Sequence, residues 1–399
     1  MKRLLLLLLV VLACGASYVI GTLSGSRTIE LPPAEWAAGS PAAEAWRQFL
    51  ASLEAAGARI YRETADPGAR AKGISHLAQL ASASLEMKLA KGDPASPAFT
   101  DWMSDYRKFL GDSPDAVYAT AEISADHQYW ISGNVGEAGY LGFMLYGRSI
   151  NGWNRAADNI SLEEMTLSEA GDFSLLLSRL RPSGYKGDWL KLDDDIHMVM
   201  VRQYFHDRPA SREASFSIAT VSPTAYRPVV EADVEHGLAQ ATLFFNETFS
   251  GNLALMEMIA KNANSFDTPR EYNQEFGGVF YPTHDNTYFG TWYVLEDDQA
   301  LVVEGVAPDV DYWSASIQNR WMQSLDYRHH QVSLNNHDID VDEEGRYRLV
   351  LSARDPGVGA WLDTAGHPEG LLAIRYQLAT DAEPPSMRVV AIADLEKER

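Results

Sequence analysis

Two regions of the chain carry the same series of sequence landmarks in the same order. Each has a Tyr-Trp pair, a glycine turn with an aromatic residue, a leucine-rich run ending in arginine, a Gly-x-Trp-Leu turn and a late arginine beside an aromatic residue. Five landmarks in register predict an internal duplication, so we expect one fold twice. The first series is Tyr129-Trp130, Gly171-Asp172-Phe173, Leu175-Leu176-Leu177-Ser178-Arg179, Gly187-Asp188-Trp189-Leu190 and Arg202-Gln203-Tyr204. The second is Tyr312-Trp313, Gly345-Arg346-Tyr347, Leu349-Val350-Leu351-Ser352-Ala353-Arg354, Gly359-Ala360-Trp361-Leu362 and Arg375-Tyr376-Gln377.

Both regions consist of short apolar and aromatic runs between glycine, aspartate and proline turns. Such runs at regular intervals are typical of antiparallel β-sandwiches, which we expect over residues 113–225 and 276–395. Apolar side chains recur every three or four residues in 42–112 and 226–275, which predicts helices there, including a short third one around 102–110. The predicted class is α+β, with two jelly-roll-like antiparallel β-sandwich domains, an N-terminal helical region and a long connecting helix.

The second region resembles the bacterial family called domain of unknown function 1214 over roughly residues 276–380, with a weaker echo over 115–205. The chain departs from the family pattern at Ala360, where the family has Asn, and at Asp363, where it has Pro. The resemblance implies a jelly-roll-like sandwich and no particular activity. It is carried by Tyr312-Trp313-Ser314, Asn335, Gly345, Asp355-Pro356-Gly357, Trp361-Leu362 and Arg375-Tyr376.

Residues 1–24 have the pattern of an export leader, and residues 25–41 that of a linker. Lys2 and Arg3 precede an uncharged run over residues 4–23, long enough as a helix to span a bilayer core of roughly 30 Å. The basic residues should stay in the cytoplasm, which places the body in the periplasm or outside the cell, anchored in the inner membrane. A retained signal anchor, a cleaved signal peptide and a lipoprotein attached at Cys14 all remain open, and all three export the body.

Charge and cysteine content exclude several classes of function. The formal net charge is −22, and no cluster of basic residues follows the first three, so we expect no nucleic-acid partner. Cys14 is the only cysteine and lies in the leader, so the body has no thiol nucleophile and no cysteine zinc site. Phosphate-binding loops, dinucleotide fingerprints, nucleophile elbows and zinc-protease motifs are missing from the sequence, and no cofactor is predicted.

Histidines of the second region are weak candidates for chemistry. His284 with Asp285 could act as a general acid and base, which would make the protein an extracytoplasmic hydrolase or lyase. His330 and His337 are weak candidate metal ligands. Neighbouring residues on a strand point to opposite faces, so His329 and His330 would not serve one site. Surface histidines are the alternative interpretation.

The repeated tryptophans and arginines are the candidate ligand-binding residues. They would fill the cores of the sandwiches, with Arg375 stacking on Trp361 in an antiparallel strand pair, or they would line a cleft for an anionic or sugar-like ligand. We expect binding of a small molecule, glycan or partner through aromatic-lined clefts, with the hydrolase or lyase as the alternative. The residues are Trp130, Trp189, Arg202, Trp313, Trp361, Arg375 and Tyr376.

Overall fold

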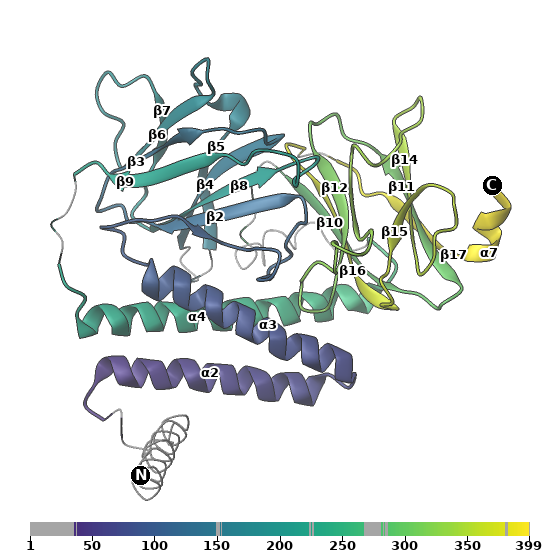
Figure 1. The fold of residues 1–399 in the computed structure, drawn as a ribbon, viewed down its shortest axis with the longest axis horizontal. Helices are drawn as coiled ribbons and strands as arrows, with labels where there is room; N and C mark the ends of the chain where they lie inside the picture. Colours follow the sequence, from purple (N-terminus) through teal and green to yellow (C-terminus); the bar gives the residue numbers. More distant parts are fainter. Residues whose placement is uncertain are drawn as a thin grey trace, which may run out of the picture.

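The computed structural model describes residues 36, 38–148, 152, 154–222, 225, 227–266, 281, 283, 286–379 and 382–398. Two β-sandwiches lie side by side, and helices run beneath them (Figure 1). The expected α+β class, with two β-sandwich domains, an N-terminal helical region and a connecting helix, is confirmed. No helix of the described residues is long and apolar enough to cross a membrane. The span expected over residues 4–23 lies outside the described residues.

The N-terminal helices begin at sequence signals for helix starts. The hydroxyl of Ser40 accepts a hydrogen bond from the amide of Ala43, and proline follows as the first residue of α2 (Pro41–Glu63). Asp66 does the same for Ala69 at the start of α3 (Pro67–Leu85), which continues as a π-helical turn (Glu86–Ala90). The third helix expected around 102–110 is absent, because Trp102 and Phe109 are buried from an irregular segment.

The first sandwich packs a five-stranded sheet, ordered β1-β2-β8-β4-β5, against a four-stranded sheet, ordered β7-β6-β3-β9. Alternate residues of both sheets fill the core between them, including Leu141, Phe143, Leu175 and Val201. The strands are β1 (Thr100–Asp101), β2 (Ala116–Glu122), β3 (Tyr129–Asn134), β4 (Tyr140–Arg148), β5 (Asn154–Ser161), β6 (Asp172–Ser178), β7 (Asp188–Lys191), β8 (Ile196–Tyr204) and β9 (Ser215–Thr220).

The second sandwich packs two four-stranded sheets, ordered β10-β16-β12-β13 and β15-β14-β11-β17. Its core includes Trp313, Leu349, Leu372 and Tyr376. The strands are β10 (Thr287–Val294), β11 (Gln299–Val306), β12 (Trp313–Gln318), β13 (Ser333–Asn335), β14 (Arg346–Ser352), β15 (Ala360–Asp363), β16 (Glu369–Tyr376) and β17 (Ser386–Ala391), and a short helix α7 (Ile392–Leu395) follows.

The strand orders of the two sandwiches match, apart from the additional edge strand β1. Strands β2 to β9 occupy the same places in the first sandwich as β10 to β17 in the second, in sequence order. Each sandwich also has an equivalent parallel pair, β6 with β7 and β14 with β15. Trp189 and Trp361 lie on the equivalent strands β7 and β15. The repeat expected from the sequence is therefore present in the strand order.

One of the five landmarks was matched wrongly. Trp130 lies on β3, whereas Trp313 lies on β12, which is equivalent to β4. The strand registers instead make Tyr140 the counterpart of Tyr312, since each lies two residues before the position opposite the late arginine. Both tyrosines precede the Gly-x-Trp-Leu tryptophan by 49 residues. The interval between landmarks therefore identifies the equivalent strands, whereas the shared Tyr-Trp dipeptide does not.

Helix α4 (Glu231–Ile259) connects the sandwiches and runs beneath both (Figure 1). Its aromatic residues Phe244 and Phe245 pack with Met144 and Met200 on the outer face of the first sandwich. Nearer its end, Met256 and Ile259 pack with Trp292 and Leu371 of the second sandwich. The equivalent outer faces of the two sandwiches therefore share one helix, which brings them next to each other.

Candidate functional site

One buried arginine projects from each of these two outer faces. Arg202 lies on β8 and Arg375 on β16, and the strand registers place them at equivalent positions of the repeat. Their exposed fractions are 5% and 6%. Arg202 and Arg375 are thus the two predicted ligand-binding residues that the fold places on the faces that meet above α4.

The guanidinium groups donate hydrogen bonds to neutral oxygens. Nη2 of Arg202 donates to Oη of Tyr146 at 2.7 Å and to the carbonyl oxygen of Tyr281 at 2.5 Å. Arg375 donates to Oγ of Ser316 at 2.9 Å and to the carbonyl oxygen of Gly111 at 2.7 Å. Gly111 belongs to the segment that leads into the first sandwich, so Arg375 links the two sandwiches.

Neither buried arginine has a carboxylate partner within 4.0 Å among the described residues. Arginine stays protonated in proteins, so burial cannot remove its charge. A buried charge without a counter-ion is costly, whereas an anion that accepts its hydrogen bonds offsets that cost. The two guanidinium groups therefore form a positively charged site without a carboxylate in direct contact among the described residues.

Tyrosines surround the arginines. The hydroxyl groups of Tyr118 and Tyr204 are 3.1 Å apart, and the ring of Tyr204 lies 5.1 Å from that of Tyr312 in the second sandwich. Burial raises the pKa of Tyr118 to about 12, and it raises the pKa of Tyr204 well above its ordinary value. Both phenols therefore keep their protons at neutral pH and can donate hydrogen bonds.

A polar seam beside the tyrosines joins the sandwiches. Asp115 precedes β2 and accepts hydrogen bonds from Oη of Tyr312 at 2.9 Å and Nδ2 of Asn335 at 3.0 Å. Nδ2 of Asn335 also donates to the carbonyl oxygen of His206 at 2.9 Å. The rings of His206 and His337 stack with their centroids 3.7 Å apart. These contacts cross between the sandwiches and fix their relative position.

The predicted tryptophans lie away from the arginines. Nε1 of Trp189 donates to Oγ of Ser178 at 2.9 Å, and Nε1 of Trp361 donates to Oγ of Ser352 at 3.1 Å, so both half-buried rings cover the parallel strand pair of their sandwich. Trp130 is half-buried against Tyr185.

Trp313 and Tyr376 are buried in the core of the second sandwich, with their ring centroids 5.7 Å apart.

The expectation that Trp361 and Arg375 meet in an antiparallel strand pair is wrong. Trp361 lies on β15, whose partner is β14, whereas Arg375 lies on β16 in the other sheet. The connection between the two strands, residues 364–368, crosses from one sheet to the other.

The candidate histidines are not brought together. Nδ1 of His330 lies 2.7 Å from Oδ2 of Asp363, near β15, whereas His337 stacks on His206 at the seam. The described residues contain no group of three or more His, Cys, Asp or Glu that could hold a metal ion. His284 and Asp285 lie outside the described residues.

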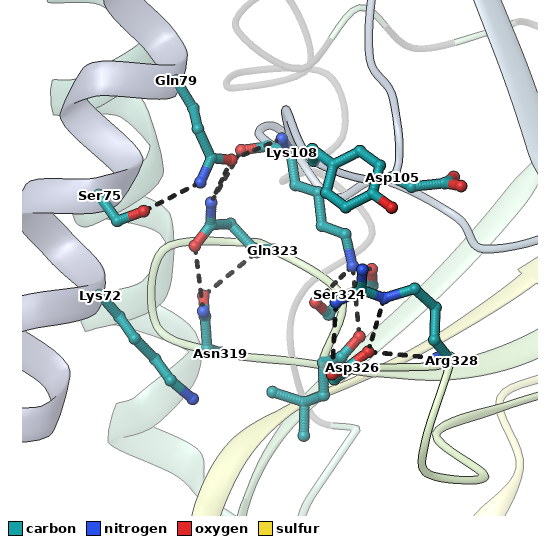
Figure 2. Close-up of a pocket in the computed structure, with 12 residues that line it drawn as sticks. Lys72, Ser75, Gln79, Asp105, Lys108, Asn319, Gln323, Ser324, Asp326 and Arg328 are labelled. Carbon is teal, nitrogen blue, oxygen red and sulfur yellow. Dashed lines mark hydrogen bonds and ion pairs between the residues drawn. The ribbon is translucent and has the colours of Figure 1, made fainter.

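A polar pocket of about 310 Å³ lies where α3 meets the loop after β12 (Figure 2). The groups that line it largely bind one another. Oε1 of Gln79 accepts from the amide of Lys108 and from Gln323, and Nζ of Lys108 donates to Oγ of Ser324 at 2.9 Å. Asp326 forms an ion pair with Arg328, whose Nε lies 3.0 Å from Oδ1 of Asp326. Because these groups already have partners, the pocket is better suited to joining α3 to the second sandwich than to binding a ligand.

Asp112, next to this pocket, should make stability depend on pH. Its carboxylate accepts hydrogen bonds from the amide and hydroxyl of Ser324 at 2.8 and 2.5 Å. Burial nevertheless raises the pKa of Asp112, and the positive charge of Lys108 offsets only part of this rise. The folded state then holds this proton more tightly than the unfolded state, so Asp112 costs stability as the pH rises from about 4 toward its folded pKa.

Asp112→Asn removes this titration. We therefore expect the free energy of unfolding to fall less between pH 4 and pH 7 in the variant than in the wild type. Urea unfolding at both pH values measures the difference. Equal pH dependence in the two proteins would contradict the prediction.

Sequence reasoning identified the arginines but missed the residues around them. Tyr118 and Tyr146 belong to strands that contributed no landmark, and Gly111 and Ser316 contact Arg375 across long stretches of chain. The available signal was the register of the repeat. It places Tyr118 opposite Arg202 and Tyr288 opposite Arg375.

No family model matches this chain, and no curated protein matches it. A crystal structure of an uncharacterised protein from Burkholderia cenocepacia is similar to it, with 27% sequence identity and a TM-score of 0.81, covering 88% of this chain and 97% of that one. A protein from Vibrio parahaemolyticus is 13% identical with a TM-score of 0.44, covering 71% of this chain and 91% of that one. The Burkholderia structure shares the fold of nearly the whole chain.

Proposed function

We propose that this protein binds a small anionic ligand between its two sandwiches. The observation that carries the proposal is the pair of equivalent, buried arginines, Arg202 and Arg375, neither of which has a carboxylate partner in the described part of the chain. Guanidinium groups recognise carboxylates and phosphates through paired, charge-assisted hydrogen bonds. The neutral hydroxyls of Tyr118 and Tyr204 add donors suited to the same ligand.

The proposal includes the location and family inferred from the sequence. The leader pattern of residues 1–24 supports a membrane-tethered envelope protein, with the ligand site in the exported body. The landmarks of the second region support a relationship to the domain of unknown function 1214 family. The hydrolase or lyase alternative depends on His284 and Asp285, and no described contact favours it over binding.

Arginine substitutions test the binding proposal. Arg202→Gln and Arg375→Gln should each weaken binding of small anions about 10- to 100-fold, because a hydrogen bond to a charged group contributes about 1.5–3 kcal/mol. Isothermal titration calorimetry at fixed ionic strength, with acetate, sulfate and phosphate as probes, measures the loss.

Arg354→Gln is the matched control, since Arg354 is exposed and pairs with Glu396 on the surface. It removes the same charge and should leave affinity unchanged. If Arg354→Gln weakens binding as much as the other two substitutions, the effect comes from net charge, and the proposed site is wrong.

A further inference from the structure

The two arginines act on the same pair of tyrosine hydroxyls. Tyr118 lies opposite Arg202 in the register of β2 and β8, and its hydroxyl is 3.1 Å from that of Tyr204. Burial raises the pKa of both tyrosines, and the charges of Arg202 and of Arg375 both oppose that rise. The ring centroid of Tyr204 lies 5.1 Å from that of Tyr312, which is two residues before Ser314, the register partner of Arg375. The tyrosines beside Arg202 therefore lie where the first sandwich contacts the second.

Several hydrogen-bond donors of this site lack partners among the described residues, and Oε1 of Gln318 beside Arg375 is a buried acceptor that also lacks one. Both described hydrogen bonds of Arg202 come from Nη2, so Nε and Nη1 have no acceptor among the described residues. Arg375 uses Nη1 and Nη2, and its Nε has none there either. Tyr118 and Tyr204 keep their protons, and one of the two hydroxyl protons suffices for the hydrogen bond between them. The site therefore offers donors from both sandwiches.

The site carries two positive charges in an environment that screens them weakly. Like charges in a low-dielectric interior repel each other, so each needs its own compensation. A monoanion would compensate one guanidinium group and leave the other unpaired, whereas a dianion would compensate both.

We infer that the ligand is a dianion that binds Arg202 and Arg375 together and so bridges the two sandwiches. This inference rests on the proposed anion site and adds the charge of the ligand. Its chemical class is a small dicarboxylate or a compact dianion of the sulfate or phosphate-ester type. Because each sandwich supplies one arginine, binding also couples the two domains.

A matched set of probes tests the charge requirement. Succinate and butyrate have four carbons each but differ by one carboxylate, and sulfate carries two charges on a compact group. At pH 7.5 and constant ionic strength, we expect succinate or sulfate to bind at least tenfold more tightly than butyrate in calorimetric titrations. A preference for succinate over sulfate would indicate two separated acidic groups, and the reverse preference a compact dianion.

Variants show whether both arginines cause the preference. In Arg375→Gln one charge remains, so the preference for the dianion over butyrate should fall below threefold, and Arg202→Gln should do the same. Arg202→Lys and Arg375→Lys keep the positive charge and should retain most of the preference. If a glutamine variant fails to fold, the lysine variants still test whether the charge at each position sets the preference. The exposed Arg354→Gln should retain all of it.

The outcomes separate this inference from the proposed function. If butyrate binds as tightly as succinate and sulfate, the protein still binds anions at the arginines, but the dianion inference is wrong. If the preference survives in both glutamine variants, it does not arise from the arginine pair, and the inference is again wrong. If none of the three anions binds the wild-type protein, the proposed function fails together with the inference.

Discussion

Trp321→Ala should lower the free energy of unfolding by about 3–5 kcal/mol, because it removes a large, fully buried side chain at the junction of three elements. Trp321 lies in the loop after β12, and its Nε1 donates to the carbonyl oxygen of Ala69 on α3 at 3.1 Å. Its ring also packs against Phe249 of α4, with the centroids 6.5 Å apart. The side chain therefore joins the second sandwich to two helices.

Gly73 shows how closely α3 approaches this ring. A Cβ atom at Gly73 would lie 2.7 Å from Cζ2 of Trp321, closer than real side chains come. The surrounding backbone is thus shaped around the indole, and the space left by alanine would collapse only in part.

Equilibrium urea unfolding measures the effect, and Trp46→Ala is the control. Trp46 lies on α2 and is 37% exposed, so its removal should change stability by about 1 kcal/mol or less. A loss below about 1 kcal/mol in Trp321→Ala would show that this junction does not hold the second sandwich to the helices.

Trp102→Ala should have a comparable effect, about 3–5 kcal/mol, at the junction between the helices and the first sandwich. The amide of Trp102 donates to the carbonyl oxygen of Tyr118 at 2.9 Å, which places the residue beside β2. Its ring contacts Phe109, Phe244 and Tyr281, with centroid distances of 5.5, 5.4 and 4.9 Å. Aromatic pairs with such edge contacts add to the stabilisation from buried area alone.

Tyr106→Ala is the matched control for Trp102→Ala, because Tyr106 lies four residues further on and is 73% exposed. Its loss should change stability by about 0.5 kcal/mol or less. Urea unfolding and near-ultraviolet circular dichroism report the global and the local effect. Equal losses in the two variants would indicate that residues 102–109 contribute through their backbone and not through the buried ring.

The similarity to the Burkholderia protein supplies a second chain on which to examine the site. The two chains share their fold over nearly their full lengths at 27% identity, so most aligned residues differ between them. Arginines at the positions equivalent to Arg202 and Arg375 would agree with a shared anion site, and their replacement by apolar residues would restrict the site to this protein.

The sequence alone determined the secondary-structure classes and the repeat, because these depend on short-range signals. The three-to-four-residue apolar spacing predicted the helices, and short apolar runs between turn residues predicted the strands. The caps at Ser40 and Asp66 are further local signals of the same kind, which the structure shows. Local spacing failed around Trp102, where buried aromatic residues in an irregular segment imitated a helical pattern. The Tyr-Trp dipeptide failed as a landmark for a related reason, since two residues carry no information on strand order.

Tertiary structure decided which residues meet. The sequence singled out Arg202, Arg375, Tyr376 and four tryptophans alike as candidate ligand-binding residues. Of these, packing brought only the arginines to the outer faces of the sandwiches that meet above α4. A strand turns successive side chains to opposite faces, so Arg375 and its neighbour Tyr376 end in different environments, one at the domain interface and one in the core. Contacts such as that of Arg375 with Gly111 join residues far apart in the chain. They depend on how the two sandwiches share α4, which no local pattern of residues encodes.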